Sequence, residues 1–247
     1  MGTRIERYGR PRRQRMNPAL ACGALLLVAV VICAGTLLLF GGQLRDAALG
    51  VVGLQASGDT DRIFAEDTAT DLQLSDVTQP ERIQVRLGDG SSRTLPVDNA
   101  LYPLQIGTAP DGAQVATTRI TESAALALCR QYTPVCQNAD PRIQNIAVDF
   151  RPGGMIVSGD VTLPEFGGVT QRIGAVLTIN GVQLDFAGID IGGTLYATAP
   201  GELGAQVEQL EQTANSILRG ASMTIDGRSY TPSALLADEQ ALTLVLR

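Results

Sequence analysis

The stretch that most constrains the fold is residues 143–191, where apolar and polar side chains alternate between turn signals. Alternation with a period of two is typical of a β-strand with one buried and one exposed face. Turn residues at 152–154, 166–168 and 180–181 divide the stretch into four parts. We therefore predict four consecutive antiparallel strands that share one apolar face.

Two glycine-containing positions predict local geometry within these strands. Asn180-Gly181 is the strongest short hairpin signal, and it predicts a type I′ turn with positive φ at both residues. At Gly188 the alternation slips by one residue, which predicts a β-bulge that bends the sheet.

An amphipathic helix is predicted to begin at Pro200 and to cover the apolar face of the strands. Pro200 and Glu202 are typical of a first helical turn, and Gly220 is typical of a helix end. Apolar side chains recur at steps of four and three, at Leu203, Val207, Leu210, Ala214 and Ile217. The exposed face is predicted to hold Gln206, Glu208, Gln209, Glu211, Gln212 and Asn215.

The predicted fold class is α+β, with a long antiparallel β-meander wrapped on an amphipathic helix and one N-terminal transmembrane helix before it. A second, shorter helix is predicted from Thr121, its N-cap, to Tyr132.

Residues 18–40 are predicted to form the transmembrane anchor. The 22 residues from Ala19 to Phe40 carry no charge, and at ~1.5 Å per residue they span about 33 Å, enough for a bilayer core of ~30 Å. Six arginines and one glutamate lie in residues 1–17, so this basic arm is predicted to be cytoplasmic and the rest of the chain extracytoplasmic. The alternative is a cleaved signal peptide, which has a shorter apolar run and a small-x-small cleavage site. We expect a single-pass protein of the cell membrane that contacts the bilayer through Ala19 to Phe40.

Three regions are predicted after the anchor. Residues 41–75 form an acidic linker, whose carboxylates lack the spacing of a calcium-binding loop. Residues 76–118 form a small β-hairpin region, and residues 119–247 form the main α+β domain. Residues 241–247 are expected to add a final strand to the same sheet as the meander.

The charge of the extracytoplasmic part excludes some partners. It contains 13 basic and 24 acidic residues, a net charge of −11. Nucleic-acid binding and docking on anionic lipid headgroups both need a basic surface. We therefore expect no nucleic-acid partner.

Cys129 and Cys136 are the only cysteines after the anchor. Two thiols seven positions apart in an oxidising compartment predict a disulfide, which in the chain-entropy model stabilises the fold by about 2–3 kcal/mol. Free thiols and half of a metal site are the alternatives, but the sequence has no histidine, so a zinc site would need two oxygen ligands. We expect no metal and no other cofactor.

Histidine and lysine, on which many nucleophilic enzymes depend, are both missing from the sequence. Without histidine, Ser-His and Cys-His systems are excluded, and without lysine so is Schiff-base chemistry. Two candidate carboxylate pairs remain, Asp149 with Asp160 and Asp185 with Asp190, but the alternation places them on the exposed face. We expect that the protein is not an enzyme.

The order of elements resembles half of a tubular lipid-binding (TULIP-like) module. The resemblance is carried by residues 121–124, 148–150, 157–161, 177–184, 203–218 and 223–227. It implies that residues 119–247 are the TULIP-like domain of a bacterial membrane-anchored envelope protein. In such a module a curled antiparallel sheet and a helix enclose an elongated apolar groove for acyl chains.

Two functional hypotheses follow. In the first, the sheet and the helix hold a lipid or another long apolar molecule in a groove lined by Val157, Val161, Leu177, Leu184, Phe186, Leu203, Val207 and Leu210. Burial of apolar surface would drive entry, at about 25 cal/mol per Å². In the second, the same side chains pack directly on one another, and the protein is a non-enzymatic envelope scaffold or interaction domain with a closed core and no ligand.

Overall fold

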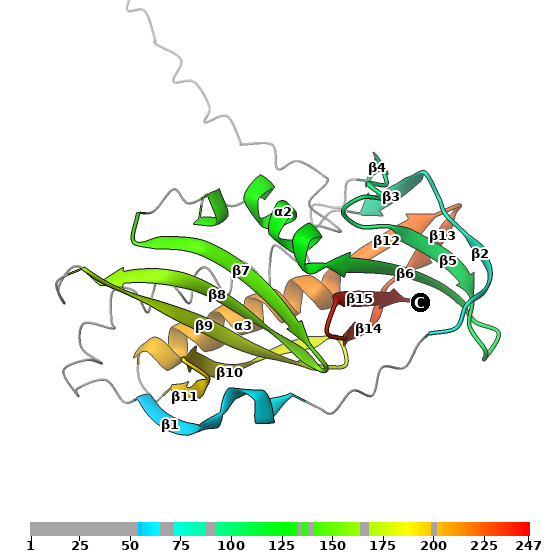
Figure 1. Cartoon of the computed structure of the whole chain (residues 1–247). Coiled ribbons are helices and arrows are strands. Elements are labelled where there is room, and N and C mark those ends of the chain that lie inside the picture. Colours follow the sequence, from blue (N-terminus) through cyan, green and yellow to red (C-terminus); the bar gives the residue numbers. More distant parts are fainter. Residues whose placement is uncertain are drawn as a thin grey trace, which may run out of the picture.

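The computed structural model describes residues 54–64, 72–86, 92–132, 135–137, 141–163, 168–198 and 202–247. Within them the chain forms three antiparallel β-sheets and two α-helices, a mixed α+β fold with a sheet-rich core (Figure 1). No helix in this part of the chain is long and apolar enough to cross a bilayer. The predicted basic arm (1–17) and anchor (18–40) lie outside the described residues.

The predicted meander is the centre of a six-stranded sheet, sheet A. Its strands lie in the order β1-β11-β10-β9-β8-β7, so the four strands predicted from residues 143–191 are neighbours in sequence order. The bounds are β7 Ile143–Arg151, β8 Gly154–Leu163, β9 Val169–Asn180, β10 Gln183–Ile191, β11 Thr194–Thr198 and β1 Leu54–Asp59. The prediction of four consecutive antiparallel strands is confirmed.

Two smaller sheets join the N-terminal and C-terminal parts of the described chain. Sheet B has the order β14-β15-β6-β5-β2, with β2 Ser75–Thr78, β5 Leu104–Thr108, β6 Gln114–Thr121, β14 Pro232–Ala237 and β15 Ala241–Leu246. Sheet C has the order β13-β12-β3-β4, with β3 Arg82–Arg86, β4 Ser92–Pro96, β12 Ser222–Ile225 and β13 Arg228–Tyr230.

The pairing of β15 corrects an expectation. The final strand pairs with β6 in sheet B and not with the meander, because its alternate leucines already reach the common core from sheet B: Leu242, Leu244 and Leu246. The predicted boundary between residues 76–118 and 119–247 passes through β6. The small hairpin region and the main domain therefore share their sheets.

The turn between β9 and β10 also differs from the prediction. Asn180 pairs with Gln183, so the two-residue loop is Gly181-Val182. Gly181 has a φ of 63°, which a type II′ turn requires at its first central position. The type I′ prediction for Asn180-Gly181 is wrong by one residue, because glycine takes the first loop position.

The predicted bulge at Gly188 is confirmed. The register between β10 and β9 shifts between Phe186 and Gly188, and the φ of Gly188 is 150°. A Cβ atom at this position would lie 2.5 Å from the carbonyl oxygen of Tyr196 on β11. Glycine therefore allows both the backbone conformation and the close approach of the next strand.

Part of the predicted acidic linker, residues 41–75, is folded. β1 pairs with β11 along its whole length, and the 3₁₀ helix η1, Thr60–Ile63, follows. Ile63 and Phe64 then pack on three buried side chains of the outer face of sheet A: Ile156, Val176 and Leu195. This corrects the expectation of a wholly solvated linker and of an outer face exposed to solvent. The apolar residues of the segment are too few and too widely spaced to form a recognisable pattern.

The two helices lie along opposite sides of the meander. α2, Glu122–Tyr132, packs beside β7, and α3, Glu202–Gly220, packs beside β10. Figure 1 shows α3 passing behind sheet A toward sheet C. The amide of Ala124 donates to Thr121 Oγ1 (3.3 Å), as expected for an N-cap residue. A short 3₁₀ helix, η2 Val135–Gln137, follows α2.

Candidate functional site

The residues predicted to line a groove meet in the layer between sheet A and the helices. The side chains of Val157, Val161, Leu177 and Leu184 are each 1% exposed, and Val207 on α3 is 4% exposed. Phe186 is half-buried and packs against the same cluster. Leu203 and Leu210 lie on α3, with side chains outside the described part.

We call this cluster the inner layer. Sheet A contributes Val148, Phe150, Met155, Val157, Val161, Ile173, Ala175, Leu177, Leu184 and Ile189. The helices contribute Ala124, Ala125, Leu128, Val207, Ala214 and Leu218. All of these side chains are 7% exposed or less. They belong to one continuous cluster that extends into sheets B and C.

Polar side chains of α3 form hydrogen bonds with the backbone of β10. Asn215 Oδ1 accepts from the amide of Leu184 (2.9 Å), and Asn215 Nδ2 donates to the carbonyl oxygen of Leu184 (3.0 Å). One helical turn earlier, Glu211 Oε2 accepts from the amide of Phe186 (3.2 Å). Asn215 is buried, although the helical pattern predicted it to be exposed.

The opposite edge of the meander is satisfied in the same way. Glu122, the first residue of α2, accepts through Oε1 from the amide of Phe150 on β7 (2.9 Å). Edge strands expose unpaired backbone groups that promote association with other strands. The two helices therefore satisfy backbone groups that the meander leaves unpaired, α3 at Leu184 and Phe186 of β10 and α2 at Phe150 of β7. A polar residue on a helix facing a strand end is the only sequence signal for such contacts, and it is indistinguishable from an ordinary exposed residue.

The two predicted disulfide residues lie together at the end of α2. Cys129 is within disulfide distance of Cys136 in η2, with 5.6 Å between their Cα atoms, and both side chains are buried in the common core. Gln137 Nε2 also donates to the carbonyl oxygen of Arg130 (2.6 Å). These contacts hold the C-terminal end of α2 against η2.

The candidate carboxylate pairs are not brought together. Asp149 pairs in register with Ile156 and Asp160 with Gln144, which separates the two carboxylates by four residues along the strands, or roughly 13 Å. Asp149 binds Arg151 instead (2.9 Å), and this hydrogen bond raises the pKa of the Arg151 guanidinium.

The remaining carboxylates are occupied separately. Asp160 binds Arg172 (3.2 Å) and accepts from Asn145 Nδ2 (2.8 Å), while Asp190 accepts from the hydroxyl of Thr60. Asp185 lies five positions from Asp190 on the same strand. Among the described residues no group of three or more His, Cys, Asp or Glu side chains is arranged to hold a metal ion.

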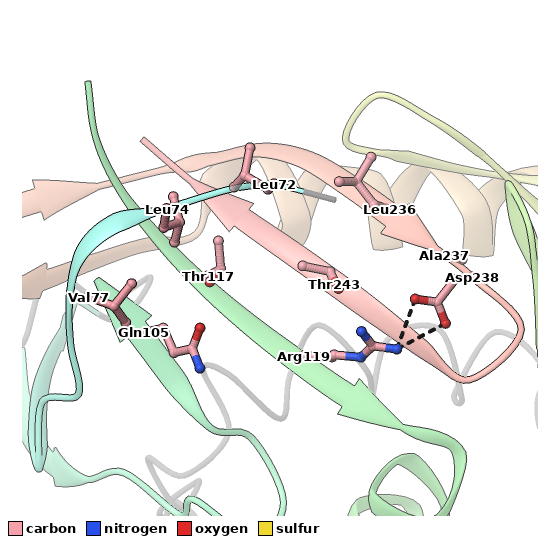
Figure 2. Close-up of a pocket in the computed structure, with 10 residues that line it drawn as sticks. All are labelled: Leu72, Leu74, Val77, Gln105, Thr117, Arg119, Leu236, Ala237, Asp238 and Thr243. Atoms are coloured by element: carbon pink, nitrogen blue, oxygen red, sulfur yellow. Dashed lines mark hydrogen bonds and ion pairs between the residues drawn. The ribbon is translucent and has the colours of Figure 1, made fainter. Parts of the chain in front are cut away.

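A cavity in the described part of the chain lies elsewhere, on the outer face of sheet B (Figure 2). It has a volume of about 280 Å³ and opens to solvent. One wall is formed by residues 72–77 and the other by the end of β14 and the turn after it, while β5, β6 and β15 form the floor. Its lining residues are Leu72, Leu74, Val77, Gln105, Thr117, Arg119, Leu236, Ala237, Asp238 and Thr243.

An ion pair closes one end of this hollow. Arg119 Nη2 lies 3.0 Å from Asp238 Oδ2 and 3.3 Å from Oδ1. The sequence analysis did not select either residue, because they are 119 positions apart and belong to no motif. Strand alternation alone identifies Arg119 as an outward residue of β6, between buried Thr118 and Ile120.

No family model, no curated protein and no solved structure matches this chain. The likeness to a tubular lipid-binding module therefore rests on the order of elements in the sequence.

Proposed function

We propose that the chain is a membrane-anchored extracytoplasmic interaction domain with a closed core and no catalytic activity. One observation carries the proposal: Val157, Val161, Leu177 and Leu184, the sheet residues expected to face a ligand, are each 1% exposed and pack in one cluster with side chains of α2 and α3. Side chains buried against protein on all sides have no surface left to offer to a ligand.

The rest of the proposal comes from the sequence. The uncharged run from Ala19 to Phe40 would anchor the chain in the bilayer, and the arginine-rich arm would remain in the cytoplasm. The absence of histidine and lysine, together with the separation of the carboxylates, supports a function in binding and not in catalysis.

A second candidate, the binding of an acyl lipid between α3 and sheet A, is favoured by the way in which the helix is attached. In the described part, the hydrogen bonds that join α3 to sheet A all go to Leu184 and Phe186 of β10. A helix held along one edge is able to swing about that edge and open the inner layer to an apolar ligand.

Lipid extraction distinguishes the two candidates. For this experiment a protease site is engineered into the full chain before Leu54. The released part then keeps β1, which pairs with β11. After release from the detergent micelle, organic extracts are analysed by mass spectrometry beside those of the Ala175→Phe variant. Ala175 is 1% exposed in the centre of the inner layer.

The closed-core proposal expects no stoichiometric acyl lipid in the wild-type extract. It also expects that Ala175→Phe destabilises the fold by about 1–3 kcal/mol, because a packed layer has no room for the ring. A stoichiometric lipid that disappears in a stably folded Ala175→Phe variant would replace this proposal with the lipid-binding candidate.

A further inference from the structure

The hollow on sheet B contains exposed apolar side chains and an arginine held in place by an ion pair. The large hydrophobic side chains that stand exposed in the described residues are Val77, at 47%, and Leu236, at 38%. Both line this one hollow, from opposite walls (Figure 2). Exposed apolar side chains scattered singly need no explanation. These two stand on one cavity, which makes that cavity the candidate for a binding surface.

The wall formed by residues 72–77 is firmly packed along part of its length. A Cβ atom added to Gly107 on β5 would lie 2.8 Å from Leu74 Cβ. Leu74 therefore packs too closely on β5 for a larger residue at position 107. Leu72 and Leu74 pack on a small buried cluster: Ala109, Val115 and Val245. The apolar surface therefore continues from this cluster into the hollow, where no described side chain covers it.

Arg119 is held in place at the other end by an aspartate that is itself fixed. Asp238 Oδ1 accepts from the amides of Gln240 (2.7 Å) and Ala241 (2.9 Å) in the turn between β14 and β15. Among the described residues Asp238 contacts the guanidinium through Nη2 alone, which leaves Nε and Nη1 as donors. The Arg119 side chain is 48% exposed. The N–H groups on Nε and Nη1 point to different sides of the guanidinium, so each is able to donate one charge-assisted hydrogen bond to a carboxylate oxygen.

We propose that this hollow is a binding site for a small monocarboxylate with a short apolar tail. The carboxylate accepts hydrogen bonds from Arg119, and the tail lies against Leu72, Leu74 and Leu236. The Thr117 and Thr243 hydroxyls of the floor lie between these two regions (Figure 2).

The volume limits the length of the ligand. At the usual packing density of about 0.74, a cavity of about 280 Å³ holds about 200 Å³ of atoms, or roughly ten non-hydrogen atoms. A carboxylate with about eight carbon atoms has this size. A diacyl lipid is several times too large, so this site is separate from the inner layer and does not depend on whether that layer opens.

The competing explanation is that Arg119 and Asp238 form an ordinary surface ion pair that closes a turn. A matched pair on sheet A provides the control: Arg172 lies 3.2 Å from Asp160, and its side chain is 51% exposed. Arg172 does not line this hollow. Arg172 also donates through Nη2 to Ser158 Oγ (2.9 Å). The two arginines match in exposure and in having an aspartate partner, and they differ in their surroundings.

Equilibrium dialysis of radiolabelled octanoate against the full chain in lipid nanodiscs tests the proposal, with empty nanodiscs as the blank. We expect saturable binding of one octanoate per chain with a Kd on the order of 0.1 mM, as for other ligands of about ten atoms. Arg119→Gln weakens binding at least tenfold, because a charge-assisted contact is lost. Leu236→Ser weakens it several-fold, and Arg172→Gln leaves it unchanged. Octan-1-ol, which has the same tail without the carboxylate, does not compete.

Three results would overturn the proposal. The first is the absence of saturable binding up to about 10 mM octanoate, a hundred times the expected Kd. The second is equal binding by the Arg119→Gln and Arg172→Gln variants, each shown by circular dichroism to keep the wild-type fold. The third is competition by octan-1-ol as strong as that by unlabelled octanoate, which would show that the site binds apolar tails without recognising the carboxylate.

Discussion

The inner layer of sheet A and the outer face of sheet B both carry apolar side chains, but these side chains are covered to different extents. The inner layer is roofed by α2 and α3, and its side chains are 7% exposed or less. The outer face of sheet B is covered by residues 72–74 at one end only, and it leaves Val77 and Leu236 exposed.

The difference shows what an apolar stripe in a sequence does and does not predict. Apolar residues that alternate over four strands predict the largest buried surface. The largest apolar face of a sheet needs the longest amphipathic helix to cover it. A ligand site needs apolar surface that remains uncovered, together with a polar group that orients the ligand. In this chain the two requirements meet on the smaller sheet and not on the larger one.

Truncation of one leucine on each surface should give the largest contrast. We expect Leu177→Ala in the inner layer to lower the free energy of unfolding by about 3 kcal/mol, because it leaves a cavity among fully packed side chains. Leu236→Ala on sheet B is the matched control and should change it by less than about 0.5 kcal/mol, since its side chain is already exposed. Urea denaturation of the full chain, followed by circular dichroism, measures both. Equal losses would mean that the two surfaces are equally covered.

Loss of the hydrogen bonds that attach α3 to β10 should give the next largest effect. Asn215→Ala leaves the amide and the carbonyl of Leu184 without their partners in a buried position, and we expect a loss of about 2 kcal/mol. Ser216→Ala, an exposed neighbour on the same helix, should change the stability by less than about 0.5 kcal/mol. A loss in Asn215→Ala as small as in Ser216→Ala would show that α3 is held by apolar packing alone.

The sequence was sufficient to predict the elements with strong local signals. Residues 143–191 alternate along most of each strand, and the bulge at Gly188 appears where the alternation slips. The N-cap at Thr121 follows from a local hydrogen bond. Even here the turn at Gly181 was displaced by one residue, because both Asn180-Gly181 and Gly181-Val182 satisfy a short hairpin and only the register distinguishes them.

What the sequence did not predict depends on contacts between distant segments. β1 joins sheet A by pairing with β11, about 140 positions away, and β15 pairs with β6 and not with the meander. Neither choice is encoded in the alternation of the strand itself, because any edge with a complementary face satisfies it. The pair of Arg119 and Asp238, and the burial of Asn215, follow from those pairings. The candidate site therefore became visible only once sheet B was assembled.

The smallest expected effect concerns pH, and it arises at one end of sheet B. Sheet B ends in a charged contact: Asp111 in the turn between β5 and β6 accepts from the amide of Ala113 (3.0 Å) and from Arg247 Nη1 after β15 (2.8 Å). These hydrogen bonds, the one from Ala113 first, lower the pKa of Asp111 from its ordinary value of 3.8. A carboxylate whose pKa is lower in the folded state stabilises the fold above its unfolded pKa, and this contribution disappears as the pH falls through the folded pKa.

We therefore expect the difference in Tm between the wild type and Asp111→Asn to be present at about pH 5 and to shrink as the pH falls toward about 2. Arg247→Gln should keep part of this pH dependence, because the bond from Ala113 remains. Thermal unfolding of the three proteins at stepped pH values measures the effect. A difference between the wild type and Asp111→Asn that stays constant down to pH values of about 2 would show that the contact does not act through ionisation. A pH dependence abolished in Arg247→Gln would place its origin in the ion pair and not in the turn.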